Sequence, residues 1–212
     1  ARHTARLAAV NGEALVVAEG MRLSAYRAAD GTPLWRHDLG PTGEVTQIVP
    51  GADGRTLAAL TTFEGGRVFL FRDGEPLRAL PTAAGDAALR DDGAVLAVTD
   101  GGHLKLYSVA DGLQWTFAGD SPLRFPRFSP DGKRLVTSSD DGSVYVLDAD
   151  PAGGRALFEA DLGARAVPLW LADGDLLLAT WMGTVRRLDA RYAEKWRTHL
   201  TPAADSSASV PK

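Results

Sequence analysis

The chain has 212 residues, of which 45% are hydrophobic and 24% are charged, and its formal net charge is −4. This is the composition of a folded globular protein, and a mildly acidic chain lacks the basic surface that nucleic acid binding favours. Cysteine is absent, which excludes disulfides, thiol nucleophiles and cysteine metal sites, and no apolar run approaches the length of a membrane span.

The same tight-turn signal occurs five times along the chain. It is an Asn-Gly or Asp-Gly pair whose glycines lie 39 or 42 residues apart, at Gly12, Gly54, Gly93, Gly132 and Gly174. Such pairs favour tight hairpins, because glycine adopts the positive φ of the turn without a steric penalty. The chain is therefore predicted to consist of five repeats.

Each turn is followed by a second glycine and then by a segment in which hydrophobic and polar residues alternate, as in half-buried strands. These segments are residues 21–26, 67–71, 103–107, 143–147 and 184–188. With its turns, each repeat reads as four strands over about 41 residues, which is the pattern of a propeller blade. We predict an all-β propeller of about five four-stranded antiparallel blades.

The blades are expected at about residues 5–40, 44–80, 85–119, 123–161 and 165–200, followed by a flexible tail or linker at 201–212. Two arrangements are open: a complete small ring, or an arc of a larger propeller. The sequence starts on an innermost strand and finishes after an outermost one, so no spare strand completes the first blade. We expect the arc, with other blades or a partner covering its ends.

Two motifs carry a family resemblance. An aromatic residue, an Asp-Gly pair and a tryptophan follow one another at Tyr26, Asp30-Gly31 and Trp35, and again at Tyr107, Asp111-Gly112 and Trp115. This pattern resembles the repeat of pyrroloquinoline-quinone-type (quinoprotein-like) propellers. Residues 128–148 are similar to a WD-type repeat without its Trp-Asp dipeptide. The resemblance implies the propeller fold, but its families include enzymes, scaffolds and assembly factors.

The tryptophans fall into two groups. Trp35, Trp115 and Trp196 occupy matching places in the outermost strands of their repeats, which predicts that each packs against a neighbouring blade. Trp170 and Trp181 lie outside this repeating position. For these two we expect core packing, with a partner-binding surface as the alternative.

The residues give little support to catalysis. A quinone-dependent dehydrogenase, which the resemblance raises, holds its cofactor over a calcium or related ion with carboxylate and amide ligands. Asn11 is the only asparagine and lies in a turn, so the amide ligand on a channel strand would have to be Gln47. No Gly-x-Ser-x-Gly motif and no phosphate-binding loop is present. We predict no catalytic residues, no cofactor and no metal.

Four arginines are the candidate binding residues. Arg90, Arg124, Arg127 and Arg165 fall on or beside the innermost strands of three consecutive repeats. Strands in that position line the central channel, and guanidinium groups there would bind carboxylate or phosphate oxygens.

Taken together, these observations favour a non-catalytic protein-binding or scaffold propeller within a larger complex or multidomain protein. Two alternatives stay open: a sensor of a small anionic ligand with an Arg-lined channel, and a degenerate quinoprotein-type dehydrogenase domain. The lack of cysteine fits both a cytoplasmic and an exported protein, so the compartment is open.

Overall fold

The computed structural model describes residues 7–200, and within them it contains five sheets of four antiparallel strands, β1 to β20. Neighbouring strands in each sheet are consecutive in sequence, so every sheet is a simple meander. The all-β propeller predicted from the repeats is confirmed. The tail predicted at 201–212, and the first two residues of the blade predicted at 5–40, lie outside the described residues.

The bounds of the strands follow the predicted repeats closely. Blade 1 comprises β1 Leu7–Asn11, β2 Ala14–Glu19, β3 Arg22–Arg27 and β4 Pro33–Asp38. Blade 2 comprises β5 Val45–Pro50, β6 Thr56–Thr61, β7 Arg67–Arg72 and β8 Glu75–Leu80, with a short 3-10 turn, η1 Phe63–Gly65, between β6 and β7. Blade 3 comprises β9 Asp86–Leu89, β10 Val95–Asp100, β11 His103–Ser108 and β12 Gly112–Ala118. Blade 4 comprises β13 Leu123–Phe128, β14 Arg134–Ser139, β15 Ser143–Asp148 and β16 Ala156–Asp161. Blade 5 comprises β17 Ala166–Trp170, β18 Leu176–Thr180, β19 Thr184–Leu188 and β20 Glu194–His199.

An Asn-Gly pair in blade 1 and Asp-Gly pairs in blades 2 to 5 form the turns between the first and second strands. In blade 2, Asp53 Oδ1 accepts hydrogen bonds from the backbone N–H groups of Arg55 (3.1 Å) and Thr56 (2.9 Å). Gly54 supplies the positive φ, 66°, that a side chain would strain. The aspartate therefore closes the turn and the glycine permits its backbone conformation.

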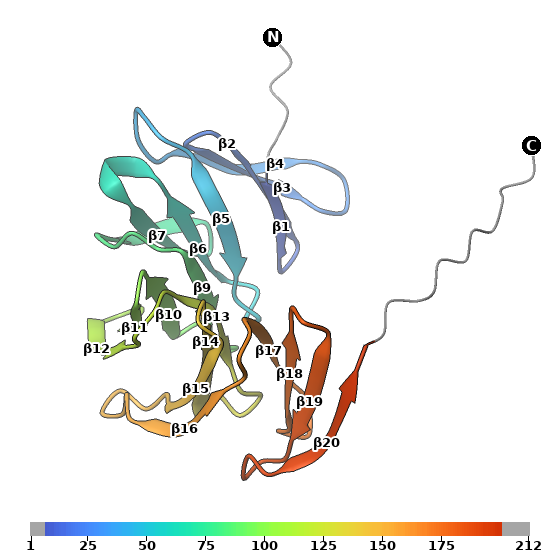
Figure 1. The fold of residues 1–212 in the computed structure, drawn as a ribbon. Coiled ribbons are helices and arrows are strands. Elements are labelled where there is room, and N and C mark those ends of the chain that lie inside the picture. The colour runs from blue at the N-terminus through green and yellow to red at the C-terminus, as the bar shows by residue number, and fades with distance from the viewer. Residues whose placement is uncertain (1–6, 201–212) are drawn as a thin grey trace, which may run out of the picture.

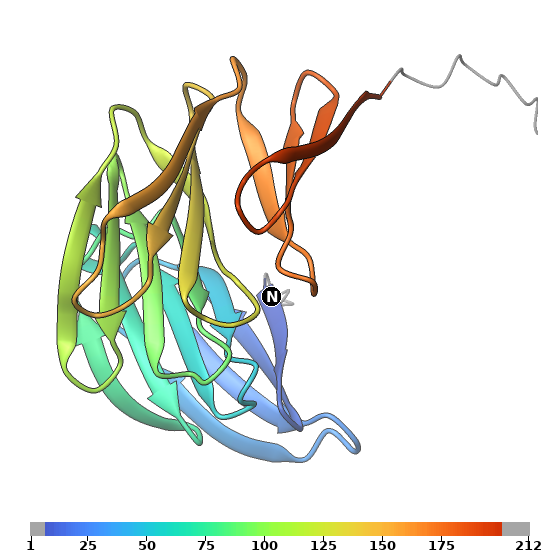
Figure 2. The same cartoon turned by 90° about the horizontal axis from the view of Figure 1, so that it is seen from below.

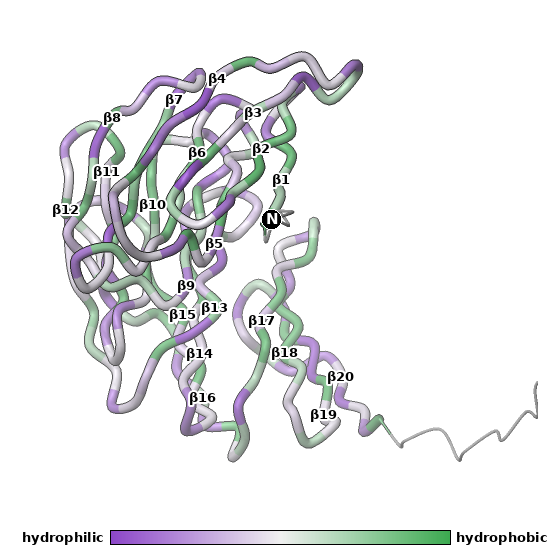
Figure 3. Tube along the Cα trace, turned by 90° about the horizontal axis from the view of Figure 1, so that it is seen from above, coloured by the Kyte–Doolittle hydropathy of each residue, from purple (hydrophilic) through white to green (hydrophobic). Residues whose placement is uncertain are grey.

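The blades are arranged around a common axis with their first strands innermost (Figure 1). Contacts join β1 to β5, β5 to β9, β9 to β13 and β13 to β17. Hydrophobic and hydrophilic segments alternate along the trace (Figure 3). The middle strands of blades 2 to 4 are largely buried, whereas the outermost strands β4, β8, β16 and β20 are largely exposed. The turns form the two mouths of the axis.

The core is divided between the blades. Among residues 7–200 the buried hydrophobic side chains form four clusters, and each cluster joins two consecutive blades: 1 with 2, 2 with 3, 3 with 4 and 4 with 5. A closed five-bladed ring needs a fifth cluster between blades 5 and 1, and the described residues form none. Figures 1 and 2 show blades 1 and 5 at the two ends of an open arc, which agrees with the arrangement expected from the sequence.

Trp35 and Trp115 pack between blades as predicted. Trp35 of blade 1 stacks on Phe71 of blade 2 with ring centroids 6.0 Å apart. Trp115 of blade 3 donates its indole N–H to the Asp150 carbonyl of blade 4 at 3.0 Å. Trp196 of blade 5 differs, because it is 43% exposed and has no following blade among the described residues.

Candidate functional site

Two of the four candidate arginines meet at one mouth of the axis. Arg124 is the second residue of β13, and Arg165 directly precedes β17, so both lie where an innermost strand begins. Both pair with Asp140, which follows β14: Arg124 Nη2 lies 3.1 Å from Oδ2, and Arg165 Nη2 lies 2.8 Å from Oδ1. The hydrogen bond from Arg124 holds the pKa of the Asp140 carboxyl below its usual value. One carboxylate thereby links blades 4 and 5.

An exposed aromatic side chain continues this surface. The guanidinium of Arg165 lies over the indole ring of Trp181, 4.9 Å from its centroid, and the Trp181 backbone N–H donates to the Arg165 carbonyl at 3.0 Å. Trp181 and Met182 form the β18–β19 turn and are 68% and 72% exposed. The packing expected for Trp181 is therefore wrong, since the turn directs the ring out of the sheet. We call Arg124, Asp140, Arg165, Trp181 and Met182 the mouth surface.

Trp170 follows the expected packing. It adjoins the core between blades 4 and 5, and its indole N–H donates to the Arg127 carbonyl at 3.1 Å. The two tryptophans outside the repeating position thus have opposite roles: Trp170 joins two blades, and Trp181 lies on the surface.

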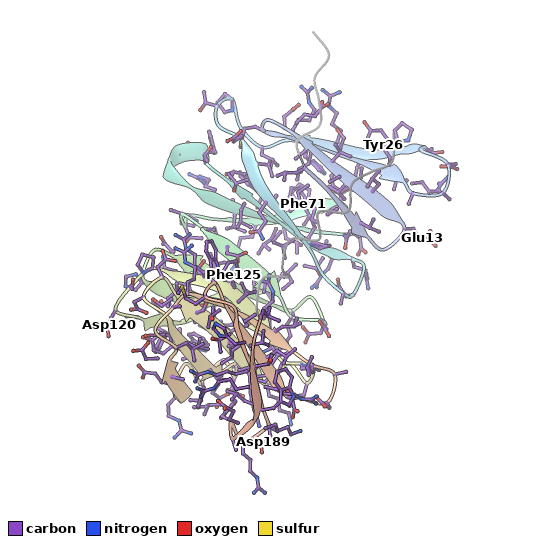
Figure 4. The ribbon with its side chains drawn as sticks, turned by 45° about the vertical axis from the view of Figure 1, so that its right-hand side comes forward. Glu13, Tyr26, Phe71, Asp120, Phe125 and Asp189 are labelled. Carbon is purple, nitrogen blue, oxygen red and sulfur yellow. The ribbon has the colours of Figure 1, made fainter. Side chains whose placement is uncertain are left out.

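A second polar group beside the mouth surface ties three blades together. Asp86, at the start of β9, accepts a hydrogen bond from Gln47 Nε2 of blade 2 at 2.9 Å and another from the Phe125 backbone N–H of blade 4 at 3.1 Å. Phe125 has a φ of 52° and lies in a bulge of β13, near the middle of the arc (Figure 4). A bulky residue in this conformation is held there by its surroundings, and here Asp86 supplies one of the constraints.

The other two candidate arginines do not join the mouth surface. Arg90 follows the last residue of β9, so it lies at the opposite mouth, where its side chain packs against Gly132 and pairs with Asp92 at 2.7 Å. Arg127 lies further along β13, and its Nη1 donates to the Pro126 carbonyl at 2.7 Å. The structure therefore brings together Arg124 and Arg165 only. A binding role for any of the four stays a prediction.

The signal for this division was present in the sequence. Arg124 and Arg165 begin their strands, whereas Arg90 ends its strand, and first strands of successive blades run in the same direction around the axis. Asp140 was missed as a member of the site, although its Asp140-Asp141-Gly142 turn lies at the same end of blade 4 as Arg124. Asp86 was also missed.

The family resemblance implies a calcium and quinone site, for which Gln47 is the one amide that the sequence offers on a channel strand. Gln47 donates its Nε2 to Asp86, and its buried Oε1 has no protein partner, so this amide does not by itself exclude such a site. Across residues 7–200, no three His, Asp or Glu side chains are close enough together to hold a metal ion. The same part of the chain includes no helix with the length and apolar character to cross a membrane.

A known family matches the chain. The family described as outer membrane protein assembly factor BamB, built from PQQ-type repeats, matches residues 1–124, which is more than half of the chain. No curated protein matches the chain.

Proposed function

Because the chain belongs to the family of outer membrane protein assembly factor BamB, we propose that it is a non-catalytic propeller that binds another protein within a larger complex or multidomain protein. The family name designates an assembly factor, which supports a protein partner. The five-bladed scaffold holds its turns at fixed places around one axis, and such turns are suited to recognition.

One observation carries the proposal: the exposure of Trp181 and Met182 beside Arg165. Tryptophan, methionine and arginine are the residue types enriched in protein interfaces, and here the three lie side by side. Arg165 is already held in place by Asp140 and by the indole ring, so little side-chain entropy remains to be lost when a partner binds. The mouth surface is therefore a pre-organised contact for a protein segment with acidic and apolar groups.

Photo-crosslinking in the cells that produce the protein tests this function. A photoreactive amino acid at Met182 is expected to form an adduct with one discrete protein. The matched control carries the same group at Lys133, an exposed residue in the β13–β14 turn at the opposite mouth, and should form no such adduct. Adding Trp181→Ala should abolish the adduct at position 182. A crosslinking pattern that is the same at both mouths, or that survives Trp181→Ala, would contradict the proposal.

Binding of a small anion is the second candidate function. The observation that favours it is the convergence of two guanidinium groups on the single carboxylate of Asp140, because clustered arginines bind phosphate and carboxylate oxygens. Titration with inorganic phosphate should give a heat of binding that is lost in Arg124→Ala/Arg165→Ala and kept in Arg90→Ala. No heat with the unmodified protein would exclude phosphate as the ligand.

A further inference from the structure

Each blade has a pair of side chains that faces the preceding blade. The pair consists of one residue of the second strand and its register partner on the third strand, and we call it the receiving pair. The receiving pairs of blades 1 to 5 are Leu15 with Tyr26, Leu57 with Phe71, Leu96 with Tyr107, Leu135 with Leu147, and Leu176 with Leu188. All ten side chains are leucine, tyrosine or phenylalanine, so the five faces share one chemistry.

Only blade 1 leaves its receiving pair uncovered. In blades 2 to 5 none of the eight side chains is more than 7% exposed. In blade 1, Leu15 is 37% and Tyr26 is 36% exposed, and Val10, the register partner of Leu15 on β1, is 61% exposed. The same position in the repeat is thus a core position four times and a surface position once.

The same face of blade 1 also has a glycine that no side chain covers. In three interfaces a bulky side chain of the outermost strand rests on a glycine in the last turn of the next blade. A Cβ atom at that glycine would lie 2.4 Å from the Trp35 ring at Gly74, 2.9 Å from the Arg78 guanidinium at Gly112 and 2.9 Å from the Trp115 ring at Gly154. The equivalent glycine of blade 1 is Gly31, and nothing lies within 4 Å of a Cβ placed there. Blade 1 therefore has both the receiving pair and the glycine, and no side chain covers either of them.

The covering face of a blade has an equally regular chemistry. Next to the receiving pair of its neighbour, each of blades 1 to 4 presents an apolar register pair from its second and third strands. These pairs are Val16 with Ala25, Ala58 with Leu70, Ala97 with Leu106, and Val136 with Val146, and all eight residues are buried.

Blade 5 is unsuited to cover blade 1, either in the same molecule or in a second copy. Its equivalent pair is Leu177 with Arg187, and Arg187 forms 2.6 Å ion pairs with Asp173 and Asp175. Docking this face on Tyr26 would bury a charged network against apolar side chains, and desolvation of such a network is costly. The charged residue therefore argues against closure through blade 5.

We propose that the face of blade 1 formed by Val10, Leu15, Tyr26 and Gly31 is the docking surface for a further four-stranded blade from outside residues 1–212. The occupant presents a small apolar pair from its second and third strands to Leu15 and Tyr26. Its outermost strand places an aromatic or arginine side chain over Gly31, as Trp35 lies over Gly74. The proposal rests on the proposed role within a larger assembly and does not involve the mouth surface.

The 212 residues contain no cysteine, so a single introduced thiol in them can be labelled. Val10→Cys and Tyr26→Cys place a thiol on the face, and Leu113→Cys, at a residue of β12 that is 54% exposed, is the control. Maleimide reaction rates are compared between the purified chain and the protein in its undisrupted source cells. In the purified chain all three thiols should react at similar rates. In the cells, positions 10 and 26 should react roughly tenfold or more slowly, because the thiol is then reached only when the covering blade opens, and position 113 should be unchanged.

Three results would overturn the proposal. Equal rates in cells and in the purified chain would show that nothing covers the face. Slow reaction at positions 10 and 26 of the purified chain would show a cover from the chain itself or from a second copy. The third is failure of Tyr26→Asp to restore fast labelling at Val10→Cys in cells, since a carboxylate in the docking surface should release the occupant.

A separate variant distinguishes this proposal from the function assigned to the mouth surface. Trp181→Ala should remove the crosslink formed at Met182 and leave the labelling rate at Val10→Cys in cells unchanged. A rate increase at position 10 in that variant would show that the blade 1 face is covered only through the mouth surface, and would contradict an independent docking site.

Discussion

Phe71 and Tyr26 occupy equivalent positions on the third strands of blades 2 and 1, but only Phe71 is covered by a neighbouring blade. Phe71 is 1% exposed and stacks on Trp35, whereas Tyr26 lies on the uncovered face of blade 1 (Figure 4). Replacing a buried phenylalanine by alanine lowers the free energy of unfolding by about 3–5 kcal/mol, through lost burial and the cavity left behind. At about 2–4 °C per kcal/mol for a chain of this size, Phe71→Ala should lower the Tm by about 6–20 °C.

Tyr26→Ala should have a much smaller effect, because the side chain is partly in water in both the folded and the unfolded state. A loss of about 1 kcal/mol or less corresponds to a fall in Tm of about 4 °C or less. The assay is thermal unfolding of the purified 212-residue chain followed by circular dichroism, with urea midpoints as an independent measure. Equal shifts for the two variants would refute the reasoning, since they would mean that the blade 1 face is packed in the isolated chain.

Trp35→Ala should destabilise the purified chain by about 2–4 kcal/mol, and Trp196→Ala by about 1 kcal/mol or less, because only the first ring lies in a blade interface. Urea unfolding midpoints measure both losses, and similar values for the two variants would contradict the arc. Asp140→Asn should cost about 1 kcal/mol or less at neutral pH. Because its folded-state pKa is lowered, the stabilisation is present above the ordinary carboxyl pKa and is lost as the pH falls through the folded value, so the variant and the parent should converge in acid. Gly12→Ala should cost more than Gly20→Ala: both glycines have a φ near 60°, but only at position 12 would the methyl group strike the neighbouring turn, 2.7 Å from a carbonyl oxygen. Unfolding midpoints that rank these two variants in the reverse order would refute that explanation.

The fold was predictable from the sequence because its signals are local. The turns at Gly54, Gly93 and Gly132 need only an Asp-Gly pair and a glycine conformation, and the alternation of each strand needs only its own residues. The packing of Trp35 and Trp115 followed from their repeated position. The 43% exposure of Trp196 did not follow from its position, because no further blade packs against it among residues 7–200.

The mouth surface was predictable only in part. The positions of Arg124 and Arg165 follow from their strands, but their shared partner Asp140 lies in the turn after β14, and its pairing with Arg165 depends on how blades 4 and 5 are set side by side. Arg90 lies at the opposite mouth because it follows the end of β9, whereas Arg124 is at the start of β13. The exposure of Trp181 did not follow from its residue type, because a tryptophan ring is buried in a strand interface but can lie in water when it is in a turn.

The separation of the blades has a consequence for how such a chain changes in length. Every strand ladder is completed within one blade, and the blades are joined mainly by side chains. Duplication or loss of a whole blade therefore leaves the remaining ladders intact and replaces one interface with another of the same chemistry. A fold of this kind can grow or shrink by whole units. In blade 5, Arg187 occupies the position at which the covering pairs of blades 1 to 4 are apolar, so a blade docked on that face would first require a substitution there.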